Sequence, residues 1–170
     1  AMDPPVHDEQ RKTVQGSVAP ANLKIMEETI RSRTQQVLDD LPVGEQFDWV
    51  DRVSIELTTQ MLATLFDFPF EDRRKLTRWS DVVIGDEESG VVESEEARQA
   101  ELYECLEYFT RLWHEREENG ERNDLVSMLA NGEATKNMSA QEYLGNLILL
   151  IVGGNDTTRN SMTGGVWALN

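Results

Sequence analysis

Asp156 and Thr157 place a carboxyl group beside a hydroxyl group directly after an aliphatic run, so this part of the sequence could support chemistry. The run 147–152 consists of aliphatic residues only, and Gly153 and Gly154 separate it from the polar residues. A hydroxyl can hold an ordered water near a reacting atom, and a carboxylate that exchanges with solvent can resupply its protons. The pair therefore predicts proton delivery to a small molecule in otherwise apolar surroundings.

The spacing assigns these residues to neighbouring edges of one helix. Leu149, Gly153 and Thr157 recur at intervals of four, and Val152 and Asp156 form the adjoining edge. A glycine inside a helix costs about 1 kcal/mol relative to alanine, so two in succession predict a weak point at which the helix widens or kinks. We expect a shallow groove there, with Leu149 and Val152 as its aliphatic wall.

The same residues also have a purely structural interpretation. Paired glycines permit close packing of helices, and Thr157 and Thr158 can hydrogen-bond to the carbonyls of the preceding turn. The acid and the hydroxyl beside the glycines favour the chemical interpretation, because close packing alone does not require them.

A second candidate binding pair stands near the start of the sequence, in the segment DPPVHDEQR. His7 and Arg11 are four residues apart and share one face of a short helix. The planar guanidinium of arginine suits a carboxylate ligand. Taken alone, the spacing of the two residues is more typical of a solvated surface pair on a first helix than of a binding site.

Helices must position both pairs, because apolar residues recur with helical periodicity and no stretch alternates as a strand does. The sequence therefore predicts an all-α chain. A capping box of Ser139 and Glu142 begins the last helix, and segment 84–96, rich in glycine, serine and acidic residues, predicts a surface loop. The expected helices are residues 5–15, 21–41, 47–66, 96–118, 124–131 and 139–170.

The composition limits the partners and the compartment. The 32 acidic and 16 basic residues give a net charge of −16, which excludes nucleic acid because phosphate binding needs positive charge. The single cysteine, Cys105, suits a reducing compartment. The aliphatic run 147–152 is far shorter than the roughly 20 residues of a membrane span. We expect a cytoplasmic protein with no membrane span.

The two motifs resemble those of the cytochromes P-450, the haem-thiolate monooxygenases. GGNDTT is similar to the oxygen-activation signature on the long central helix of that family. The resemblance implies that Gly153 lies where oxygen sits, that Thr157 hydrogen-bonds the bound oxygen, and that Asp156 takes part in the proton relay.

DPPVHDEQR is similar to the helix of the same family that binds a haem propionate. The resemblance implies haem b as the cofactor, with His7 and Arg11 on its propionate. It also implies electrons from NAD(P)H through a ferredoxin and a ferredoxin reductase, with a docking face near Arg11 and Lys12.

Segments 47–81 and 145–160 resemble the bacterial soluble branch that hydroxylates the terminal carbon of medium-chain alkanes. This resemblance implies that one oxygen atom of O2 is inserted into a C–H bond of a linear aliphatic molecule. It implies that Leu149 and Val152 line the substrate pocket.

The resemblance covers all 170 residues and implies the central portion of the cytochrome P-450 fold, roughly its third to ninth lettered helices, truncated at both ends. Residues 1–16 would form the haem-propionate helix, 66–118 the substrate lid helices and loop, and 139–170 the oxygen-activation helix. The loop that carries the family's axial cysteine is missing, and Cys105 is expected to be a packing residue. We therefore expect an internal fragment with no metal ligand, which alone binds haem poorly and is inactive.

Two other classes of protein compete with this interpretation. A carboxylate di-iron bundle needs Glu-x-x-His on two helices, but the positions three before His7 and His114 hold proline and arginine. A non-enzymatic acidic helical interaction module would explain the charge and the amphipathic helices. It would not explain Asp156 and Thr157 beside the glycines.

Overall fold

The computed structural model describes residues 3–85, 88–120 and 122–170. Residues 1–2 of the expected haem-propionate segment and residues 86–87 of the expected loop lie outside these ranges. The described residues form helices and no strand, as the sequence predicts, and none of these helices is long and apolar enough to cross a membrane. In chain order the elements are α1 (Val6–Val14), the 3-10 helix η1 (Gln15–Val18), α2 (Pro20–Asp39), the π-helix η2 (Val50–Ile55), α3 (Glu56–Phe66), the 3-10 helix η3 (Phe70–Asp72), α4 (Arg74–Ile84), α5 (Glu95–Asn119), α6 (Leu125–Asn131) and α7 (Ala140–Leu169).

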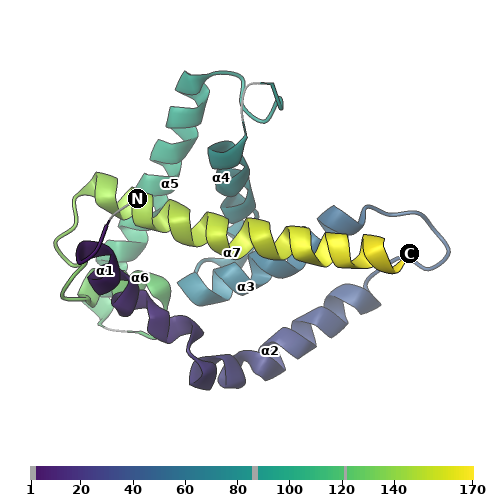
Figure 1. The fold of residues 1–170 in the computed structure, drawn as a ribbon, viewed down its shortest axis with the longest axis horizontal. Coiled ribbons are helices and arrows are strands. Elements are labelled where there is room, and N and C mark those ends of the chain that lie inside the picture. The colour runs from purple at the N-terminus through teal and green to yellow at the C-terminus, as the bar shows by residue number, and fades with distance from the viewer. Residues whose placement is uncertain (1–2, 86–87, 121) are drawn as a thin grey trace.

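Helix α7, which is 30 residues long, is the central helix of the fold (Figure 1). It begins at the predicted capping box, in which the Ser139 hydroxyl accepts the N–H of Glu142 and the Glu142 carboxylate accepts the N–H of Ser139. Figure 1 shows α7 crossing the whole molecule, with α4 and α5 rising on one side and α2 passing on the other. Helices α3 and α4 and the π-helix η2 pack directly against α7.

The hydrophobic core lies between α3, α4, α5, α6 and α7, with α6 packed on α5 and α3. The rings of Phe66, Phe68, Trp79 and Phe109 pack with centroids 5.3 to 6.1 Å apart, distances typical of stabilising aromatic pairs. Cys105 belongs to the same cluster and is fully buried. The prediction that it is a packing residue is therefore confirmed.

The segment 47–66 is not one uniform α-helix. It begins with the π-helical turns of η2, where the Asp48 carboxylate accepts the N–H of Asp51 at 3.1 Å, and continues as α3. The Ser54 hydroxyl of η2 lies 2.9 Å from the Thr163 hydroxyl of α7. Burial on two sides, expected from the apolar residues, is found, since α3 contacts α2, α4 and α7.

Helices α4 and α5 are joined by side chains as well as by the loop between them. Arg98 of α5 donates hydrogen bonds of 2.6 Å to the carbonyls of Val82 and Gly85, which satisfies carbonyl groups at the end of α4. Arg78 of α4 pairs with Glu101 of α5. The two helices therefore stand together as one linked pair (Figure 1).

Candidate functional site on helix α7

One face of α7 is a row of buried residues at intervals of four, which we call the buried stripe. Tyr143, Leu147, Ile151 and Asn155 are each at most 5% exposed. The amide oxygen of Asn155 accepts a hydrogen bond of 2.8 Å from the hydroxyl of Thr58 on α3. The buried stripe attaches α7 to the rest of the molecule.

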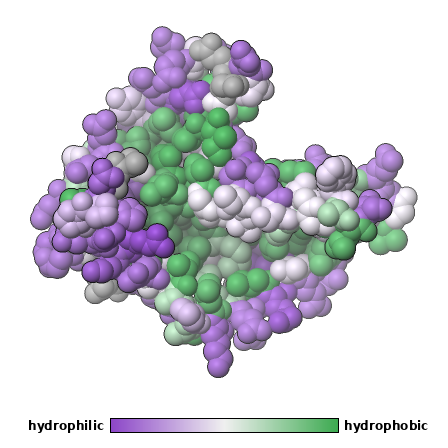
Figure 2. Space-filling view, in the orientation of Figure 1, coloured by the Kyte–Doolittle hydropathy of each residue, from purple (hydrophilic) through white to green (hydrophobic). Residues whose placement is uncertain are grey.

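The opposite face carries the predicted site, and we call it the open stripe. It consists of Leu149, Gly153 and Thr157, all exposed. It points away from the core because a step of two residues turns a helix by about 200°. Figure 2 shows hydrophobic residues around the first half of α7 and paler residues of near-neutral hydropathy along its second half. Leu149 is 67% exposed, whereas Val152, on the adjoining edge, is partly buried.

The expected break at the glycines is absent, and the prediction of a widened or kinked helix is wrong for this structure. Helix α7 is continuous from Ala140 to Leu169. Ile151 and Asn155, just before and after the glycines, are both fully buried, so the helix has fixed contacts on either side of the pair. The Thr157 hydroxyl also donates to the Gly153 carbonyl at 3.0 Å.

The two glycines have different surroundings. A Cβ atom on Gly154 would lie 2.7 Å from Cδ2 of Leu62 on α3, closer than van der Waals contact allows. A Cβ atom on Gly153 would meet nothing within 4 Å. The structural interpretation, close packing, therefore applies to Gly154, while Gly153 leaves open space beside Thr157.

Asp156 lies between the two stripes and is partly buried. Its carboxylate accepts hydrogen bonds from Arg159 at 2.7 Å and from Asn160 at 3.3 Å. Arg159 also donates to the carboxylate of Asp81 on α4 at 2.9 Å. The structure thus places Asp156 and Thr157 on adjacent edges of α7, with Asp156 engaged on the side of α4.

Arg159 is charged in this arrangement. Burial lowers the pKa of its guanidinium, but the hydrogen bonds and negative charges of Asp81 and Asp156 outweigh that effect and hold the pKa above its usual value. A permanently charged guanidinium shared by two carboxylates is a stable ion-pair arrangement.

Helix α1 carries the second predicted pair. His7 is partly buried and Arg11 is exposed, and the His7 imidazole Nδ1 lies 3.0 Å from the carboxylate of Asp8. The buried side chain of Gln10 accepts a hydrogen bond of 3.2 Å from Asn146 of α7. This hydrogen bond joins α1 to the first half of α7, about two helical turns before Gly153.

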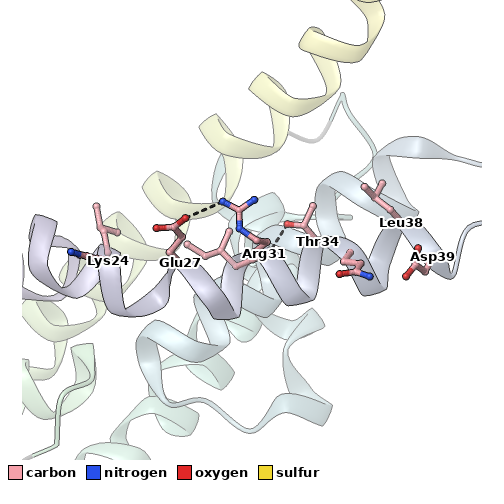
Figure 3. Close-up of a pocket in the computed structure, with 9 residues that line it drawn as sticks. Lys24, Glu27, Arg31, Thr34, Leu38 and Asp39 are labelled. Carbon is pink, nitrogen blue, oxygen red and sulfur yellow. Dashed lines mark hydrogen bonds and ion pairs between the residues drawn. The ribbon is translucent and has the colours of Figure 1, made fainter.

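Three surface hollows lie away from the open stripe. One lies between α1 and α6 and another between α4 and α5. The third, of about 700 Å³, runs along α2, and the ion pair of Glu27 and Arg31, 2.9 Å long, lies among its lining residues (Figure 3). The residues that line it are Leu23, Lys24, Glu27, Ile30, Arg31, Thr34, Gln35, Leu38 and Asp39.

None of these three hollows is lined by Asp156 or by a residue of the open stripe. The residues predicted to form the groove, Leu149, Gly153 and Thr157, lie on an exposed face of α7. Within the described ranges, no group of three or more histidine, cysteine and carboxylate side chains could hold a metal ion.

Sequence reasoning missed Arg159 and Asp81. Arg159 follows Asp156 by three positions, and this spacing is a known signal for an ion pair on a helix. Asp81 stands 78 positions before Arg159, and no local pattern relates residues so far apart.

Comparisons with known proteins test the resemblance. No protein-family model matches the chain. The chain is 32% identical to linalool 8-monooxygenase from Pseudomonas putida, over 96% of this chain and 40% of that protein. It is also 32% identical to steroid C26-monooxygenase from Mycolicibacterium smegmatis, over 98% of this chain and 39% of that protein.

A solved structure, cytochrome P-450-153 from Novosphingobium aromaticivorans, matches the fold with a TM-score of 0.85. The two sequences are 50% identical, and the match covers 99% of this chain and 40% of that one. The chain thus spans about 40% of the length of the relatives it matches. Because sequence and fold agree along nearly all of its length, the chain belongs to the cytochrome P-450 family and forms part of that fold.

Proposed function

We propose that this chain belongs to a haem-dependent monooxygenase that inserts one oxygen atom of O2 into a C–H bond. The proposed reaction is terminal hydroxylation of medium-chain alkanes or similar linear aliphatic molecules. The observation that carries the proposal is the open stripe, in which Gly153 leaves free space beside the Thr157 hydroxyl. The 50% identity to cytochrome P-450-153 supports the choice of subfamily.

The residues present fit a haem group. The open stripe offers an apolar side chain, Leu149, and an uncovered glycine, Gly153, against which a flat ring can lie. His7 and the exposed Arg11 on α1 are donors suited to the propionate carboxylates. Bound haem supplies the activation of oxygen and the oxidising power for the C–H bond.

Thr157 and Asp156 deliver protons in this proposal. The Thr157 hydroxyl donates its hydrogen to the Gly153 carbonyl, so its lone pairs remain available to accept a hydrogen bond from a water. That water can donate a proton on the open side of Gly153. Asp156 is partly exposed, so it can exchange protons with solvent and resupply the water.

Leu149 and Val152 provide the apolar wall. They exclude water from the bound aliphatic chain, which directs the oxidant to a C–H bond. We assign residues 66–118, which include the linked pair α4 and α5, to the lid over the substrate entrance, and residues 139–170 to the oxygen-activation helix. Helix α4 packs on α7, so a displacement of this pair would change access to that helix.

The proposal includes a source of electrons. A ferredoxin and its reductase, supplied by NAD(P)H in the cytoplasm, would dock near α1, where Arg11 and Lys12 are exposed. Two cations on a chain of net charge −16 offer a local contact for an acidic carrier. Because the chain spans about 40% of its relatives, the activity is proposed for a protein of their length. The 170 residues alone are expected to bind haem poorly and to be inactive.

The test is the Thr157→Ala substitution in the haem-containing protein with its redox partners. We expect the yield of hydroxylated alkane per NAD(P)H to fall at least about tenfold, with the electrons released as hydrogen peroxide, because the proton-donating water loses its anchor. Thr158→Ala is the matched control, since Thr158 is an exposed threonine on the next position of the same helix. An unchanged yield in Thr157→Ala, or an equal loss in both variants, would refute the proposal.

A further inference from the structure

Arg159 joins two helices through two carboxylates. One guanidinium nitrogen donates to Asp156 at 2.7 Å on the preceding turn of α7, and the other donates to Asp81 of α4 at 2.9 Å. The side chain of Arg159 is 14% exposed, less than that of either carboxylate. The planar fork of arginine can hold two carboxylates in fixed directions, whereas a lysine ammonium offers no such geometry.

Asp156 has few other constraints on its orientation. Its second carboxylate oxygen accepts a hydrogen bond of 3.3 Å from the exposed Asn160, which is longer and weaker than the ion pair. Arg159 is fixed in turn by Asp81, because α4 packs along α7. The direction of the Asp156 carboxylate therefore depends on where α4 stands.

We propose that Arg159 is a positioning residue for Asp156, and that Asp81 transmits the position of α4 to it. This inference rests on the proposed function, in which Asp156 resupplies protons. When α4 is seated on α7, Arg159 holds Asp156 in one orientation. When α4 is displaced, Asp81 leaves Arg159, and Asp156 is held by a guanidinium that is itself free to turn.

The first experiment tests the link between Asp81 and Arg159, which we call the bridge, by its contribution to stability and not by catalysis. Asp81→Asn and Arg159→Gln, singly and combined, are compared by thermal unfolding of the haem-containing protein. If the bridge exists, the shift of the combined variant is smaller than the sum of the two single shifts, because the second change removes an interaction already lost. Additive shifts would overturn the proposal.

The second experiment measures how electrons divide between product and hydrogen peroxide. We expect Arg159→Gln and Asp81→Asn each to raise the peroxide fraction at least about twofold, with no further rise when they are combined. Asp81→Glu, which keeps the charge, should leave the peroxide fraction close to that of the unchanged protein. Arg159→Lys should give a peroxide fraction between those of the unchanged protein and Arg159→Gln. Glu101→Gln is the matched control, since it breaks an ion pair of α4 with α5 instead of α7.

The outcomes separate the two proposals. If Thr157→Ala raises the peroxide fraction but Arg159→Gln and Asp81→Asn do not, the role of Arg159 is refuted and the proposed function stands. An equal rise in Glu101→Gln would also refute it, because the effect would then come from loosening of α4 in general. If Thr157→Ala leaves the fraction unchanged, both proposals fail.

Discussion

The two opposite faces of α7 share one backbone and similar aliphatic side chains, yet their surroundings differ. Leu147 on the buried stripe is fully buried, and Leu149, two positions later on the open stripe, is 67% exposed. The buried stripe ends in Asn155, which is held by Thr58 of α3. The open stripe ends in Thr157, whose hydroxyl donates to the carbonyl of Gly153 on its own helix. One helix therefore combines a buried face that stabilises the fold with an exposed face.

The glycine pair has a different effect on each face of α7, and it does not interrupt the helix. Helix α7 is continuous through the glycines, and the fully buried residues Ile151 and Asn155 of the buried stripe flank them. The missing side chain of Gly153 then produces free space on the other face rather than a kink. Rigid support behind and open space in front are what a site on a helix requires.

The two stripes should contribute very differently to the stability of the fold, and truncating one side chain on each stripe measures that difference. Ile151→Ala should lower the free energy of unfolding of the 170-residue chain by about 2–5 kcal/mol, because it leaves a cavity in the core. Leu149→Ala, the matched change on the open stripe, should alter it by less than about 0.5 kcal/mol. Urea unfolding followed by circular dichroism measures both values. Equal losses would show that the two faces are not different environments.

A second prediction compares the reactivity of a thiol in the buried core with that of a thiol introduced on the open stripe. Burial, with a smaller effect of the nearby Glu104 charge, raises the pKa of the Cys105 thiol to about 12. A thiol reagent at pH 8 should therefore label Cys105 on the order of 100-fold more slowly than a cysteine introduced by Leu149→Cys. Mass spectrometry of the labelled peptides gives both rates. Comparable rates in the folded protein would contradict the burial of the core.

The same pKa shift has a consequence for stability. The folded protein holds the Cys105 proton more tightly than the unfolded chain, whose thiol has its ordinary pKa of 9.0. The stability of the folded state is therefore unaffected by this group below pH 9 and falls as the pH rises from 9 toward 12. Cys105→Ala should remove this part of the alkaline loss.

The last prediction concerns the two glycines, which should respond differently to substitution by alanine. Gly153→Ala should stabilise the 170-residue chain by about 0.5–1 kcal/mol, because alanine favours the helix and its Cβ meets nothing. Gly154→Ala gains the same helix preference but forces the buried Leu62 to move, which costs about 1–3 kcal/mol. Thermal unfolding should therefore find Gly154→Ala the less stable variant. The reverse order would mean that Gly154 does not pack closely on α3.

Much of the helical layout was predictable because its determinants are local. The capping box at Ser139 and the loop expected between the helices near 84–96 follow from residues adjacent in sequence. The capping box is present, and the described residues 88–94 are not helical. The π-helical start at 50–55 was not predictable, because no residue there departs from an ordinary helical pattern. The ion pair of Arg159 and Asp81 was not predictable for another reason, because it joins residues on two helices that meet only in the folded chain.

The order of residues alone predicts the all-α class, the family resemblance and the spacing that puts Leu149, Gly153 and Thr157 on one face, because helical periodicity depends only on that order. The packing of the helices determines which face of α7 is buried, which of the two glycines is open, and that Asp156 is linked to α4 through Arg159. These outcomes depend on which helices pack against α7, and packing partners are set by contacts between segments distant in the chain.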